Sequence, residues 1–135
     1  MILMNRRGLI VYGTMLLLLC VGAHAQIGKK ATRPLPPFVE MMPGATKMTN
    51  SAFSNEMREG GTVVAGVEQP AAAILSFYRA SMQRNGLTPG AETTTPRGAV
   101  LLKALSADGK RELRLEVNPP KSTRVIIQLN YVVNK

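Results

Sequence analysis

The residue types that most often carry catalysis are scarce in this chain, and two of them lie close to its start. The single histidine, His24, and the single cysteine, Cys20, both fall within the first 25 of 135 residues. A Ser-His-acid triad, a histidine-activated cysteine and the usual Cys and His ligands of zinc all need these types in the folded domain. If the first 25 residues are removed, none of these sites can form. We therefore predict no catalytic residue and no metal site.

Paired carboxylates are a further route to acid-base catalysis. Asp108, the sole aspartate, is followed by glycine and suits a two-residue primed turn between strands. Glu112 and Glu116 alternate with Arg114 on one face of a predicted strand, where Glu116 would form a cross-strand ion pair with Arg124. The glycines match neither a phosphate-binding loop nor a dinucleotide fingerprint. We predict a non-catalytic protein without a cofactor; the alternative is a small hydrolase that lacks His and Cys.

The N-terminus has the layout of a secretory signal peptide. A short basic stretch precedes an apolar run over residues 8–22, and Ala23 and Ala25 form the small-x-small pattern that predicts cleavage before Gln26. This pattern indicates a periplasmic or secreted protein. One alternative is an inner-membrane anchor that retains residues 8–22, although that run is shorter than the roughly 20 residues of a spanning helix. The other is lipidation at Cys20, although a leucine precedes it where a small residue is usual.

Charge and composition divide the chain into three parts. The formal net charge is +9, and it falls to +7 (15 basic and 8 acidic residues) once residues 1–25 are removed. Such a balance favours an acidic envelope protein or an anionic surface as partner. Because aromatic residues make up only 4% and Trp is absent, we expect no nucleic acid. We predict a signal peptide over 1–25, a basic, proline-rich linker over 26–37 and a single domain over 38–135.

One helix organises the predicted domain. Pro70 suits the first turn of a helix, and Asn85-Gly86 suits a left-handed stop, so we expect the helix between Gln69 and Gly86. Its apolar residues recur with helical spacing and predict a single buried face: Ala71, Ile74, Leu75, Tyr78 and Met82. Because Tyr78 lies on this face, we interpret it as a core residue with a hydrogen-bonded hydroxyl rather than as a polar group in a cleft.

The remaining segments alternate in the manner of strands. Two strands, at 46–57 and 62–68, are expected before the helix, with a tight turn at Glu59-Gly60-Gly61. Three more are expected after it, at 99–106, 110–117 and 123–133, with a short edge strand somewhere in 87–95. The predicted order is β-β-α-β-β-β, with one optional further strand. The fold class is therefore α+β, with one helix packed on an antiparallel sheet.

The register of the last three strands can be predicted from their turns. A turn at Asp108-Gly109 pairs Leu102 with Leu115, and a turn centred on Pro120 pairs Leu115 with Val125. In this register one sheet face points away from the helix and carries basic residues among aliphatic ones: Leu101, Lys103, Arg114, Arg124 and Ile126. We interpret this set either as a docking face for an acidic, partly apolar partner or as an ordinary solvent face.

Two short motifs resemble those of a class of small exported bacterial proteins of uncharacterised function. One is the Pro-Gly entry to a first strand, here Met42-Pro43-Gly44-Ala45, and the other is a helix of the form F-Y-x-x-x-[LM]-x-x-x-G, here Phe77 to Gly86. The resemblance extends from about Pro37 to Lys135, although Leu87 stands where an aromatic residue is common. It implies a helix-on-sheet domain in the bacterial envelope. The expected function is that of an exported binding or accessory module.

Overall fold

The computed structural model describes residues 34–135. The predicted signal peptide, its cleavage site at Ala23, Ala25 and Gln26, and the greater part of the predicted linker lie outside the described residues. Residues 34–135 form one helix on an antiparallel sheet, which confirms the α+β class and, approximately, the predicted order. The elements are β1 (Thr46–Ser54), β2 (Arg58–Val67), α2 (Ala71–Arg84), β3 (Leu87–Pro89), β4 (Thr93–Thr94), β5 (Val100–Ser106), β6 (Arg111–Val117) and β7 (Val125–Asn134).

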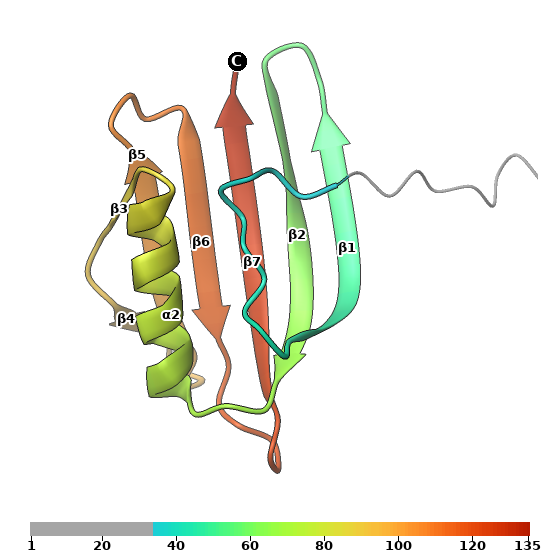
Figure 1. Ribbon diagram of the computed structural model, residues 1–135, viewed down its shortest axis with the longest axis vertical. Coiled ribbons are helices and arrows are strands. Elements are labelled where there is room, and N and C mark those ends of the chain that lie inside the picture. Colours follow the sequence, from blue (N-terminus) through green and yellow to red (C-terminus); the bar gives the residue numbers. More distant parts are fainter. Residues whose placement is uncertain (1–33) are drawn as a thin grey trace, which may run out of the picture. The chain divides into compact units, whose positions relative to one another are not determined.

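The sheet places its strands in the order β1-β2-β7-β6-β5-β3, with β4 paired to β5 beside this path. Every pairing between these strands is antiparallel. The C-terminal strand β7 therefore lies in the middle, between the first hairpin and the later meander (Figure 1). The predicted edge strand within 87–95 is divided into β3 and β4, with Pro89 at the end of β3.

The predicted register is correct for one strand pair and wrong for the next. Leu102 faces Leu115, as expected from the short turn between β5 and β6. That turn is not a primed one, since Gly109 (φ 72°) has a positive φ and Asp108 has not. Across β6 and β7, Leu115 faces Leu129 rather than Val125, a shift of four residues. A shift by an even number of residues leaves the same side chains facing the core, so the residues predicted to face inward still do so.

The longer β6–β7 connection explains the shift. Both the backbone N–H and the side-chain Nδ2 of Asn118 donate to the carbonyl oxygen of Ile126, eight residues farther along the chain, and these bonds close the loop. The two prolines that follow have no N–H for ladder bonding, and Lys121 forms an isolated bridge with Arg124 instead. β7 consequently begins at Val125.

The first hairpin also turns earlier than predicted. Its turn uses Asn55, whose Oδ1 accepts from the backbone N–H groups of Met57 and Arg58, so the predicted turn at Glu59-Gly60-Gly61 is wrong. Gly60 and Gly61 are buried in β2. A Cβ at either position would lie under 3.0 Å from a neighbouring strand's carbonyl oxygen. These glycines allow close backbone packing rather than a reversal of the chain.

The helix follows its predicted boundaries closely. Pro70 is its N-cap residue and Gly86 (φ 75°) takes the left-handed conformation just beyond its end. Ile74, Tyr78 and Met82 are fully buried as expected. Ser81 is buried beside them, and its place among apolar residues was not predicted. This face packs against β3 and β6.

A coil spanning residues 34–45 covers the other half of the same sheet face (Figure 1). Phe38, Val39 and Met42 are buried in the common core. The Phe38 ring meets the Tyr131 ring of β7 edge-on, with centroids 6.3 Å apart. Leu35, which falls within the predicted linker, is half-buried against this core. Helix and coil thus share one face of the sheet, and no described element packs on the other.

Candidate functional site

The uncovered side of the sheet, called the outer face below, carries the predicted docking residues. Leu101 and Lys103 point outward from β5 and Arg114 from β6, because their strand neighbours are the buried residues of the core. Lys103 and Arg114 are directly opposite each other, as predicted. Leu101 and Leu105 keep 36% and 39% of their surface exposed. Charged and aliphatic side chains are therefore mixed on this face.

The two basic residues of the strand pair share one carboxylate. Glu112 Oε2 lies 3.6 Å from Lys103 Nζ, and Glu112 Oε1 accepts from Arg114 Nε. The carboxylate relieves the repulsion that two facing cations would otherwise experience. It also removes part of the positive charge that the sequence places on β5 and β6.

Arg124 and Ile126 lie farther from this pair than predicted. Arg124 precedes β7, and its side chain lies over Gly66 of β2, where a Cβ would come within 2.8 Å of its Cδ atom. Glu116 faces Gln128 rather than Arg124, so the predicted Glu116–Arg124 ion pair is wrong. The four-residue shift of β7 is the physical reason. Four predicted docking residues remain on the sheet itself, and Arg124 belongs to the adjoining loop.

Ile126 borders a hollow of about 580 Å³ at this end of the sheet. Arg97 and Lys121 also line it, together with Asn118, Pro119 and Pro120. The turn that contains Arg97 lies against Pro119, since a Cβ on Gly98 would be 3.3 Å from the proline ring. Arg97, Lys121 and Arg124 form no ion pair within residues 34–135. Arg97 and Lys121 therefore place positive charge without an ion-pair partner among residues 34–135 at the rim of this hollow.

Sequence reasoning missed Arg97 and Lys121 as site residues. Each lies in a loop, and the two loops are separated by two strands in the sequence. The available signal was proline and glycine next to each cation, which marks turns at sheet ends. The β5–β6 pairing, which the sequence predicts correctly, already brings the start of β5 and the end of β6 to the same end of the sheet, so the two turns could have been placed together.

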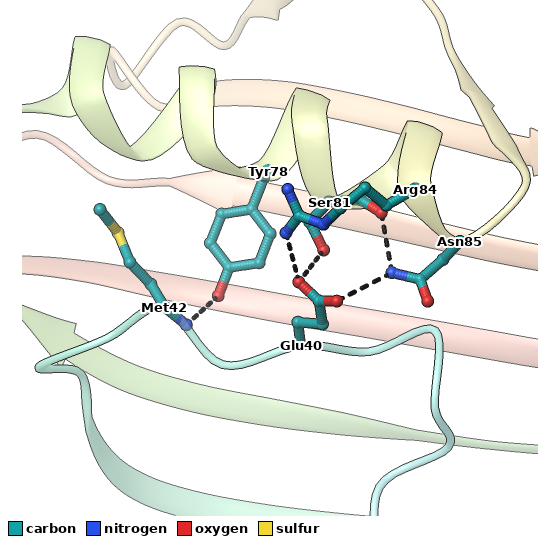
Figure 2. Close-up of polar contacts among 6 residues, drawn as sticks. All are labelled: Glu40, Met42, Tyr78, Ser81, Arg84 and Asn85. Atoms are coloured by element: carbon teal, nitrogen blue, oxygen red, sulfur yellow. Dashed lines mark hydrogen bonds and ion pairs between the residues drawn. The ribbon is translucent and has the colours of Figure 1, made fainter.

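A polar cluster on the covered side joins the coil to the helix (Figure 2). Glu40 of the coil accepts hydrogen bonds from Arg84 Nη2 at 2.7 Å, Ser81 Oγ at 2.9 Å and Asn85 Nδ2 at 3.2 Å. The Arg84 hydrogen bond, followed by those from Ser81 and Asn85, lowers the pKa of the Glu40 carboxyl below its ordinary 4.5. All its near neighbours are donors, so Glu40 is held as an anion and acts as a structural tie.

Tyr78 lies next to this cluster and behaves as predicted from its position on the helix. Its ring is fully buried, and its hydroxyl oxygen accepts from the backbone N–H of Met42 at 3.2 Å (Figure 2). Burial raises the pKa of Tyr78 to about 12. A phenol with this pKa remains protonated at neutral pH and is a poor general base. The prediction of a core role with a hydrogen-bonded hydroxyl is confirmed.

The carboxylate of Asp108 also has local structural partners. Asp108 accepts from Ser106 Oγ and from the backbone N–H of Lys110 in the β5–β6 turn, and these bonds lower the pKa of its carboxyl. Within residues 34–135, no three His, Cys, Asp or Glu side chains are grouped so that they could hold a metal ion. In the same range, no helix is long and apolar enough to cross a membrane.

Comparison with known proteins adds nothing to this geometry. No family model, no curated protein and no solved structure matches the chain. The functional argument therefore depends on the residues and contacts described above.

Proposed function

We propose that this chain is an exported, non-catalytic binding module of the bacterial envelope, whose outer face docks an acidic, partly apolar segment of another envelope protein. The export part rests on the signal-peptide layout of residues 1–25, with cleavage before Gln26. The docking part rests on one observation: the uncovered sheet face ends in a hollow lined by two cations, Arg97 and Lys121, that form no ion pair within residues 34–135.

The chemistry of that region favours an acidic partner with some apolar side chains. Arg97 and Lys121 border the hollow and present guanidinium and ammonium groups, which attract carboxylates. Ile126 and two prolines supply apolar surface in the same hollow, and Leu101 exposes further apolar surface on the same sheet face. Isolated surface charges contribute little to affinity, so both parts of the surface are needed for specific binding.

Site-specific crosslinking in cells tests the docking face. A photoreactive amino acid at Leu101 should give a discrete crosslinked product from the envelope fraction, and the product should be lost when Arg97 and Lys121 are both changed to Glu. The matched control places the same group at Ala80, which is exposed on the helix. Equal products from both positions, or a product insensitive to the double reversal in a folded variant, would contradict the proposal. A crosslink to anionic lipid would instead show that this face binds a membrane surface and not an acidic protein, and would contradict the proposal.

Intact mass spectrometry of protein from its native compartment tests the export part. We expect the measured mass to be that of a chain that begins at Gln26. A full-length mass would support the retained anchor, and a mass increased by acyl groups with Cys20 at the N-terminus would support lipidation.

A further inference from the structure

We propose that the free edge of β1 pairs with β1 of a second copy of this chain, so that two sheets join into one continuous antiparallel sheet. The two edges of the described sheet differ greatly. β3 is three residues long and ends in proline, and β4 is two residues long. β1 is nine residues long, lies at the other end of the strand order (Figure 1), and all its side chains except Asn50 are exposed.

The hydrogen bonding of the hairpin shows which groups of β1 face that edge. The Asn55 N–H donates to the Arg58 carbonyl oxygen at 2.9 Å, so these two residues form a hydrogen-bonded pair. Antiparallel pairs alternate between bonded and non-bonded residues. The backbone groups of Phe53, Ser51 and Thr49 therefore bond to β2, whereas those of Ser54, Ala52 and Asn50 point away from it.

This edge lacks the features that usually prevent strand pairing. Natural edges are protected by charges, prolines, bulges or short length. From Thr49 to Ser54 the strand T-N-S-A-F-S contains no charge and no proline, and its pairing with β2 is regular. The bulge lies before this stretch, between Lys47 and Thr49. Six regular, uncharged residues are thus available to a further strand.

A second copy fits this stretch because the sequence is complementary to itself. A two-fold axis at Ala52 pairs residues 49–55 of each copy, which is the longest overlap that avoids the bulge. Edge-facing residues then meet edge-facing residues: Asn50 opposite Ser54, and Ala52 opposite its own counterpart. Strand pairing of this kind satisfies main-chain groups of both copies at once.

Exposed apolar residues support the same arrangement. Met48, Phe53 and Met57 are three of the five large hydrophobic residues exposed within residues 34–135, and all three lie on β1 or in the turn after it. In the proposed register the two Phe53 rings, each 44% exposed, are diagonal neighbours about 7–8 Å apart at Cα, within reach of aromatic side chains.

Disulfide trapping tests both the pairing and its register in the full-length chain with Cys20 replaced by serine. In Ala52→Cys the two introduced thiols would meet at the two-fold axis, where Cα atoms of a bonded pair lie about 5.5 Å apart, a distance that a disulfide spans. We expect a disulfide-linked dimer under mild oxidation. Ser54→Cys is the matched control. Residue 54 lies on the same strand and the same sheet face as residue 52, yet the Cα atoms of the two copies of residue 54 would lie about 14 Å apart. A dimer from Ser54→Cys and none from Ala52→Cys would overturn the register.

Sedimentation equilibrium tests the association without a covalent trap. The Cys20→Ser chain should self-associate between micromolar and millimolar concentrations, since a single strand pair is a small interface. Ala52→Pro removes an edge-facing N–H and none of the β2 ladder, so self-association should fall by about tenfold or more with an unchanged circular dichroism spectrum. A wild-type chain that remains monomeric at millimolar concentration, or an Ala52→Pro variant that is folded and associates equally, would overturn the proposal.

Discussion

Glu40 offers the sharpest test of how the coil is held on the sheet. Replacing it by glutamine keeps the size of the side chain and one acceptor oxygen, but removes the negative charge. Arg84 then loses an ion pair whose two side chains are 54% and 35% exposed, which is worth about 0–1 kcal/mol. The fully buried Ser81 hydroxyl and the Asn85 amide must share the remaining oxygen. We expect a total loss of about 1–2 kcal/mol at pH 7.

The pH dependence of this loss identifies its cause. Because the hydrogen bonds lower the pKa of Glu40 in the folded protein, its carboxylate stabilises the fold fully at pH values above the ordinary pKa that it has in the unfolded chain. That stabilisation decreases as the pH falls through the folded-state pKa. The difference between wild type and Glu40→Gln should therefore be complete at pH 7 and nearly absent at about pH 2. Asp108 is the same in both proteins, so its lowered pKa cancels in the difference.

Urea unfolding at a series of pH values measures this difference, and thermal unfolding should show it as about 4–8 °C per kcal/mol in a domain of this size. Glu92→Gln is the matched control. It breaks the exposed Arg79–Glu92 ion pair, 3.0 Å long, which holds the helix to the segment after β3, and should cost less than about 1 kcal/mol. The reasoning is refuted if Glu40→Gln is no less stable than Glu92→Gln at pH 7, or if its deficit persists unchanged at about pH 2.

Three further substitutions test the core with equilibrium urea unfolding. Tyr78→Phe should destabilise the fold by about 1–3 kcal/mol, because the Met42 N–H loses its acceptor in the interior; a neutral result would show that another acceptor replaces the phenol. Leu129→Ala should cost about 2–5 kcal/mol, because this fully buried side chain lies at the centre of the sheet; a loss below 1 kcal/mol would contradict that position. Gly61→Ala should cost about 1–3 kcal/mol or prevent folding, because its Cβ would collide with the Ser51 carbonyl oxygen; wild-type stability would place this residue in a turn after all.

Local sequence signals were enough to predict the helix and the β5–β6 pair. Helical spacing and the flanking proline and glycine placed α2 to within two residues of its observed ends, because these signals act through the backbone of the helix itself. The short turn after Ser106 fixed the pairing of Leu102 with Leu115, since a short connection leaves few registers open.

Contacts between segments that are distant in the sequence could not be predicted in the same way. Asn118 closes its loop through the carbonyl of Ile126, and no residue near Pro120 indicates that choice, so the β7 register was predicted wrongly. The Gly60-Gly61 pair resembles a turn in the sequence, whereas its reason is the close approach of the neighbouring strands. Glu40 was not singled out, because its three partners are more than 40 residues away.

The central position of β7 has a consequence for the order in which the chain can fold. Ribosomes deliver the N-terminus of a chain first, yet the strand that joins β2 to β6 is the last of the described strands to be made. Until Val125–Asn134 emerges, the first hairpin and the β5–β6 hairpin have no common neighbour to unite them. Contacts between such distant segments are slow to form. A chain with this topology keeps its two hairpins apart until β7 has been delivered, so the strand that comes last in the described sheet is also the one that closes it.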